Sequence, residues 1–111
     1  MMTTLRFLPD WSQEQTGAIR AGEPLRIEYD PQRLTSCRAS RYGQPAWSIA
    51  AYLRFHPGGQ EKSGSLMSGS LDVEVPHSTT QVEMWFNNTD HTGCVAWDSR
   101  HGQNYWLDTE S

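Results

Sequence analysis

Three aromatic residues lie in alternating stretches on the same side as polar residues rather than on the side of the aliphatic ones. They are Tyr52, Trp85 and Trp106. An aromatic ring on the solvent side of a sheet is costly to leave bare, so several together indicate a contact surface. Planar rings beside Asn, Asp and Arg suit sugars, because the ring packs on the apolar CH face while its polar neighbours bind hydroxyls. The alternative is that loops cover these rings and that each has only a structural role.

Residues 93–107 add polar groups to this candidate site. They predict a strand, a polar turn and a second strand, with Trp97 at the start of the turn. Asp98, Arg100 and Asn104 in this segment are candidate ligand-binding residues. A structural interpretation also holds, because Asp and Asn side chains hydrogen-bond to turn backbone and Gly102 tolerates positive φ.

The same segment resembles the ending of starch- and glycogen-binding modules, Trp-Asp-Asn-Asn-x-Gly-x-Asn-Tyr. In that family the polar turn and the adjacent aromatic residues contact the glucan, so the resemblance implies glucan-type carbohydrate binding. Ser99 and Arg100 stand where that family has Asn. The matching residues are Trp97, Asp98, Gly102, Asn104 and Tyr105.

A longer pattern resembles an uncharacterised bacterial family of small β-sandwich domains. That resemblance implies a fold and no activity. Its parts are Tyr29-Asp30-Pro31, Cys37-Arg38, Trp85-Phe86 and Gly93-Cys94 to Tyr105.

Cys37 and Cys94 are the only cysteines of the chain. A disulfide between them would close a long loop and stabilise the fold, while two reduced, buried thiols are the alternative in a chain without a visible secretion signal. The sequence leaves both open.

No residue pattern predicts catalysis or a metal site. The sequence has no CxxC, HExxH or G-x-S-x-G spacing, and we expect no enzyme activity and no cofactor. A calcium ion held by Asp90, Asp98 and turn carbonyls is the alternative for the cofactor. A small hydrolase using His101 or Asp98 is a third functional hypothesis.

The remaining titratable side chains fit ordinary solvent-exposed roles. Acidic residues in the polar phase of strands are expected to be surface charges, and histidines at turns or strand ends to be solvated. The acidic residues are Glu28, Asp72, Glu74 and Glu83, and the histidines are His56, His77, His91 and His101.

The elements that would position these residues are strands. Apolar residues alternate with polar ones along residues 25–30, 47–56, 71–75 and 82–87, and shorter strands are predicted at 4–8, 94–97 and 104–108. Trp47, Phe55 and Phe86 alternate in register with the aliphatic residues of these strands, which predicts that they lie in the core. Residues 10–15 predict a helical turn or an irregular edge, and residues 60–70 a mobile loop or irregular edge.

Seven or eight short strands without a long helix predict an all-β, antiparallel immunoglobulin-like β-sandwich, with residues 1–111 as its single domain. A small barrel is the rival architecture. The length of 111 residues leaves no room for two independent cores.

Charge and hydropathy exclude several classes of partner. The net charge is −4 and Lys62 is the only lysine, so the chain lacks the basic face that nucleic acid or anionic lipid requires. No apolar stretch reaches the ~20 residues of a membrane span. Without a signal peptide we expect a cytoplasmic location, with export by another route left open.

We therefore expect a non-catalytic binding module that binds carbohydrate through Tyr52, Trp85 and Trp106 and the polar turn. The alternative is a protein-interaction or assembly domain that uses the same aromatic residues as interface anchors. The sequence does not decide the oligomeric state.

Overall fold

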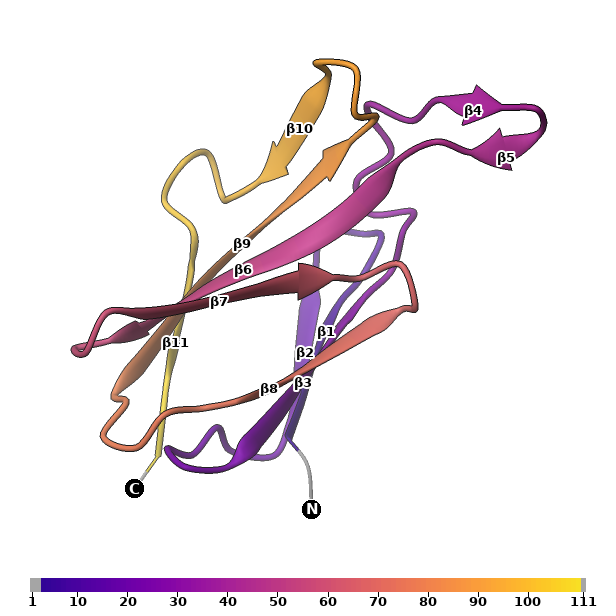
Figure 1. Ribbon diagram of the computed structural model, residues 1–111. Helices are drawn as coiled ribbons and strands as arrows, with labels where there is room; N and C mark the ends of the chain where they lie inside the picture. The colour runs from indigo at the N-terminus through magenta and orange to yellow at the C-terminus, as the bar shows by residue number, and fades with distance from the viewer. Residues whose placement is uncertain (1–2, 111) are drawn as a thin grey trace.

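The computed structural model describes residues 3–110, which form strands and no helix (Figure 1). In this part of the chain there is consequently no helix that could span a membrane. The strands are β1 (Thr3–Phe7), β2 (Gln13–Thr16), β3 (Pro24–Tyr29), β4 (Ser40–Arg41), β5 (Gln44–Pro45), β6 (Ser48–His56), β7 (Gln60–Ser65), β8 (Ser70–Glu74), β9 (Gln81–Thr89), β10 (Val95–Asp98) and β11 (Tyr105–Asp108).

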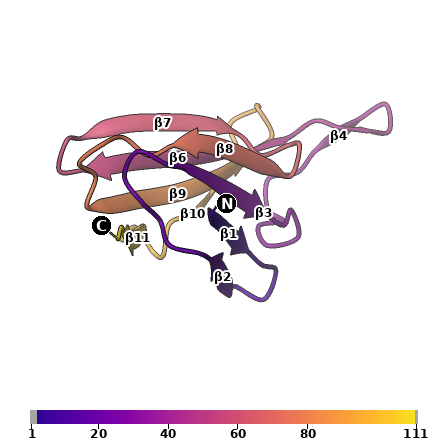
Figure 2. The ribbon, with the colours of Figure 1, turned by 90° about the horizontal axis from the view of Figure 1, so that it is seen from below.

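Two main sheets face each other across one core (Figure 2). The first has the order β2-β1-β3-β8, and the second has the order β10-β9-β6-β7 with β11 also paired to β9. The predicted all-β class is confirmed. The immunoglobulin-like form of the sandwich stays a prediction.

One strand pair contradicts the prediction of a purely antiparallel fold. β1 and β3 run parallel, with Leu5 opposite Ile27. The cause is β2, which pairs antiparallel with the other edge of β1 and so returns the chain to the end where β1 began. β3 then starts at that end and runs in the same direction as β1.

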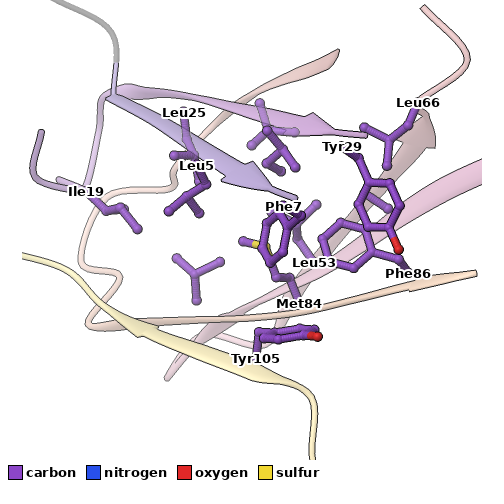
Figure 3. Packing of buried hydrophobic residues seen from close by; sticks show 14 of the residues in the cluster. Leu5, Phe7, Ile19, Leu25, Tyr29, Leu53, Leu66, Met84, Phe86 and Tyr105 are labelled. Carbon is purple, nitrogen blue, oxygen red and sulfur yellow. The ribbon is translucent and has the colours of Figure 1, made fainter. Parts of the chain in front are cut away.

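The core forms because alternate residues of the long strands point to the same side (Figure 3). β6 buries every second residue from Ile49 to Phe55, and Met84 and Phe86 of β9 pack with them. A large apolar side chain buried to this extent contributes roughly 1.5–3 kcal/mol. The core assignments of Phe55 and Phe86 are confirmed, while Trp47 is only partly buried and packs on the edge of the core.

Two strands of the main sheets, β2 and β7, have no apolar alternation in the sequence. β2 lies where a helical turn or irregular edge was expected, and β7 lies within the expected loop. Both are almost wholly exposed sheet edges, and each is held by backbone pairing to a strongly patterned neighbour, β1 or β6. Such pairing depends on the partner strand and leaves no local signal.

Cys37 and Cys94 form a disulfide that fixes the segment between β3 and β6 to the β9–β10 turn. Asn88 supports the same junction, because its buried side-chain amide donates to the carbonyls of Ser36 and Cys37. Beyond this junction the β4–β5 hairpin projects from the body of the molecule (Figure 1).

The disulfide closes a loop with a sequence separation of 57 residues. We expect the double variant Cys37→Ser/Cys94→Ser to lose roughly 4 kcal/mol of unfolding free energy, because the unfolded chain regains the freedom that the loop removes. Urea denaturation of the oxidised wild type and of the variant measures this difference. Reduced wild type should behave like the variant, and an unchanged urea midpoint for both would contradict the expectation.

Candidate functional site

The outer face of the five-stranded sheet carries four large aromatic side chains, Tyr52, Trp85, Trp97 and Trp106, which we call the aromatic face. The register sets Tyr52 opposite Trp85, and their rings stack with centroids 5.9 Å apart and planes 10° from parallel. The Trp97 ring lies 6.4 Å from that of Tyr52. Trp97 is 56% exposed and Trp106 46%. Strands β6, β9, β10 and β11 thus bring these rings to one solvent-facing surface.

A break in the sheet edge arranges the rings along β9. β10 pairs with residues 86–89 of β9 and β11 with residues 81–84, so Trp85 lies between the two registers. Trp97 is opposite Asn87, and Trp106 is opposite Glu83. Diagonal neighbours across strands are about 7–8 Å apart. Trp97 and Trp106 therefore flank Trp85 from its two sides along the strand.

Polar side chains between the rings form a fixed hydrogen-bond network around Glu83. One carboxylate oxygen of Glu83 lies 2.8 Å from Nε2 of His56, and the other accepts a 2.6 Å hydrogen bond from Nδ2 of Asn104. Arg54 lies 3.9 Å from the same carboxylate. The His56 ring also stacks on Trp106, with centroids 4.9 Å apart.

Glu83 and His56 differ from the solvated side chains that the sequence predicted. Glu83 is only 7% exposed, and His56 is half-buried against Trp106. Burial alone would raise the pKa of Glu83, but hydrogen bonds with Asn104 and His56 and the charge of Arg54 outweigh it and lower that pKa. The prediction failed because alternation shows to which side of the sheet a side chain points, but it does not show which neighbouring side chains cover it there.

A cavity of about 570 Å³ opens beside the aromatic face, where the chain leaves β10. Trp11 and Trp97 line it, and Arg100, His101 and Gln103 come from the loop between β10 and β11. Asp98 and Tyr105 also line it and are themselves buried. Trp97 belongs to both features, so the aromatic face and the cavity are continuous.

Next to this cavity lies a buried ionic cluster formed by Asp98, Arg33, Tyr29 and Tyr105, which we call the Asp98 cluster. Asp98 Oδ2 accepts hydrogen bonds from Nε of Arg33 and from the Tyr29 hydroxyl, both at 2.8 Å. Asp98 Oδ1 accepts a 2.5 Å hydrogen bond from the Tyr105 hydroxyl, which in turn accepts one from Nη2 of Arg33. The side chains of Arg33 and Asp98 are 0% and 1% exposed.

The surroundings raise the pKa values of Tyr29, Tyr105 and Arg33 in the Asp98 cluster. Burial and the charge of Asp98 raise the pKa of Tyr29, and burial and the hydrogen bond to Asp98 raise that of Tyr105. Burial is the largest influence on Arg33 and lowers its pKa, but the hydrogen bond and charge of Asp98 together with Tyr105 outweigh it, so the pKa of Arg33 is raised. The tyrosines therefore remain hydrogen-bond donors, and the cluster holds the two sheets together.

The structure divides the six residues that the sequence proposed for ligand binding into two groups. Four lie together on the outer sheet face, and the other two lie at the cavity. Asp98 is hydrogen-bonded within the protein through both oxygens, so we assign it to support of the fold, whereas Arg100 is exposed. The first group is Tyr52, Trp85, Asn104 and Trp106, and the second is Asp98 and Arg100.

Sequence reasoning missed Trp97, Trp11 and Arg33. Trp97 lies on the same side of its strand as Val95, and a strand of four residues is too short for its sequence to show which side is apolar and which is polar. The signal that could have found it is the buried neighbour Asp98, since adjacent strand residues face opposite sides. Trp11 and Arg33 lie outside strands, and no local pattern marks their positions.

The loop carboxylates considered for calcium have protein hydrogen-bond donors. The Asp90 side chain accepts hydrogen bonds from the backbone amides of Thr92 and Cys94, and the first of these is the leading cause that lowers its pKa. Across residues 3–110, no three His, Cys, Asp or Glu side chains converge as a metal site would require. Binding of calcium remains a prediction without a site in the structure.

Removal of the negative charge from the Asp98 cluster should destabilise the fold strongly. Asp98→Asn leaves Arg33 buried without its counter-charge, for which we expect a loss of ~3–5 kcal/mol in unfolding free energy. Chemical denaturation measures it. The matched control is Asp72→Asn, which removes an exposed ion pair with Arg26 and should change stability far less. Equal losses in the two variants would contradict the assignment.

Glu83 should contribute to the acid sensitivity of the protein. Because its pKa is lower in the folded state than its ordinary value of 4.5, its stabilising contribution is present above that value and is lost as pH falls through the lower one. We expect the unfolding free energy of Glu83→Gln to fall less steeply than that of the wild type from about pH 5 downward. Denaturation curves across this range test it, and parallel slopes would contradict it.

Comparison with curated proteins finds no match, and comparison with solved structures finds none either. A family model matches residues 2–110, which is nearly the whole chain. The expectation of an uncharacterised family is thereby confirmed, while the resemblance to starch- and glycogen-binding modules stays a prediction. The chain belongs to a family of unknown function, DUF6209.

Proposed function

We propose that this protein is a non-catalytic module that binds a glycan along the aromatic face. The observation that supports it is the stacked Tyr52–Trp85 pair with Trp97 and Trp106 on either side, all on one solvent-facing sheet surface. Aromatic rings in a row offer successive apolar surfaces to the CH faces of neighbouring sugar rings. The proposed ligand is accordingly a chain of pyranose units rather than one isolated sugar.

The polar groups of the aromatic face suit recognition of hydroxyl groups. Asn104, His56 and Arg54 are already ordered around Glu83, so binding requires little further loss of side-chain freedom. Asn87 donates to the Tyr52 hydroxyl at 3.3 Å and fixes that ring as well. Rigid rings with ordered polar neighbours can distinguish sugars by the positions of their hydroxyls.

The state of Glu83 supports the proposal of binding without catalysis on this surface. A glycosidase needs a carboxylic acid whose pKa is raised so that it can protonate the leaving group. Glu83 has a lowered pKa and both of its oxygens are hydrogen-bonded, so it remains a charged acceptor. The glucan class of ligand is proposed from the resemblance of Trp97, Asp98, Asn104 and Tyr105 to starch-binding modules.

A protein interface is the second candidate for the same surface. Large exposed aromatic side chains are common anchors of protein–protein contacts, and Trp97 and Trp106 have this exposure. This candidate predicts a dimer whose stability depends on Trp106, which mass measurement over a range of concentrations would detect. A monomer at all concentrations, together with sugar binding, favours the glycan module.

Replacement of a ring of the aromatic face should weaken glycan binding. We expect Trp106→Ala to reduce the affinity for a soluble glucan roughly tenfold or more, because an aromatic contact of this size is worth ~1.5–3 kcal/mol. Calorimetry or tryptophan fluorescence during titration with a glucan gives the affinity. The control is Tyr42→Ala, which removes a fully exposed ring from the projecting hairpin and should leave binding unchanged.

A series of glucans, chitin fragments and simple sugars should be tested with the wild type first. No response to any of them would overturn the proposal. Equal effects of Trp106→Ala and Tyr42→Ala would show that the aromatic face is not the binding surface.

A further inference from the structure

The cavity next to the aromatic face has walls suited to a ring-shaped ligand. Trp11 and Trp97 contribute indole rings to its lining, and its volume of about 570 Å³ lies within the ~300–1,000 Å³ typical of small-molecule sites. Trp97 also belongs to the aromatic face. A ligand chain that follows the aromatic face past Trp97 would therefore enter this cavity with its last unit.

The cavity carries an exposed positive charge. Asp98 is neutralised by Arg33 inside the protein, so the charge that remains at the cavity is that of Arg100. Arg100 is exposed, and within residues 3–110 its guanidinium has neither an ion pair nor a side-chain hydrogen bond. His101 lies beside it and adds further hydrogen-bonding capacity.

The backbone holds these side chains in a defined arrangement. Arg100, His101 and Trp11 have positive φ values of 48°, 59° and 68°, a region that side-chain-bearing residues adopt at a cost. The loop is closed by a 2.6 Å hydrogen bond from the amide of Asn104 to the carbonyl of Ser99. These φ values and this hydrogen bond define the loop conformation that brings Arg100 and His101 to the cavity.

We propose that this cavity binds an anionic pyranose, a sugar ring that carries a carboxylate or a sulfate, with Arg100 as the residue that recognises the anion. Guanidinium groups bind such oxygens through paired, charge-assisted hydrogen bonds, and the tryptophan rings supply the surface for the sugar ring. This inference rests on the proposed function, because the acidic sugar would be one unit of the glycan that binds along the aromatic face. It adds that the glycan is acidic.

The test compares glycans that differ only in charge. The probes are maltohexaose, the same oligosaccharide with its 6-hydroxymethyl groups oxidised to carboxylates, and its 6-sulfated form. Calorimetry gives the affinity of each for the wild type, for Arg100→Gln and for the control Arg41→Gln, which removes the same charge from the exposed β4–β5 hairpin. Free glucuronate serves as a probe of the cavity alone.

We expect an acidic form to bind the wild type roughly tenfold or more tightly than maltohexaose. Arg100→Gln should remove this advantage, Arg41→Gln should leave it intact, and added salt should reduce it. An advantage of the carboxylated form alone, or of the sulfated form alone, identifies the anion and supports the proposal in either case.

Several results would overturn the proposal or separate it from the proposed function. The anionic-sugar proposal is overturned if neutral and acidic forms bind with equal affinity, or if the acidic forms still bind Arg100→Gln more tightly than maltohexaose does. If Trp106→Ala weakens binding in the same experiments, the glycan module still stands. Binding of free glucuronate that depends on Arg100, with no response to any oligosaccharide, supports the cavity site and contradicts the glycan module. No binding of any probe overturns both.

Discussion

The buried ion pair between Arg33 and Asp98 is the interaction on which the arrangement of this molecule depends. Arg33 comes from the segment after β3, Asp98 ends β10, and the hydroxyls of Tyr29 and Tyr105 join them from β3 and β11. Arg33 also donates to the carbonyls of Leu8 and Ser12 in the β1–β2 connection. One guanidinium thus connects both sheets. Such a pair stabilises a fold only with good hydrogen-bond geometry, and here each nitrogen of the Arg33 guanidinium and each carboxylate oxygen of Asp98 has a hydrogen-bond partner.

The aromatic face is a direct consequence of this buried pair. Successive residues of a strand point to opposite sides, so fixing Asp98 and Tyr105 inside the protein places Trp97 and Trp106 outside it. The loop between Asp98 and Tyr105 must leave the sheet at this point, and it carries Arg100 to the cavity. The position of the exposed rings is therefore set by polar contacts in the interior.

Alternation of residues was sufficient to find the four strands β3, β6, β8 and β9, and shorter strands were predicted where β1, β10 and β11 lie. The polar side of these strands also gave the outward placement of Tyr52, Trp85 and Trp106. It was insufficient wherever a position depends on a distant strand. The parallel pairing of β1 with β3, the edge strands β2 and β7, and the burial of Glu83 all arise from neighbours remote in sequence. Arg33 was missed because a buried arginine outside a strand looks the same in sequence as an exposed one.

The negative net charge of −4 overstates how acidic the aromatic face is. Glu83 is hydrogen-bonded to Asn104 and His56 and lies 3.9 Å from Arg54, and Arg54 also pairs with Glu61 at 3.1 Å. A carboxylate that is already hydrogen-bonded within the protein repels an approaching ligand less than a free one. The distribution of charge is therefore uneven, with Glu83 and Glu61 paired near the rings and the exposed guanidinium of Arg100 at the cavity.

The break in the sheet edge opposite Trp85 has a consequence for solubility. A continuous exposed strand is a template to which another chain can add, and a sheet with aromatic rings on its outer face is at particular risk of such growth. Here the outer edge is divided into two strands of four residues, β10 and β11, separated by a loop that leaves the sheet. A foreign strand would find no uninterrupted row of backbone donors and acceptors along this edge. The edge formed by β10 and β11, which carries Trp97 and Trp106, is therefore less open to edge-to-edge pairing than one continuous strand would be.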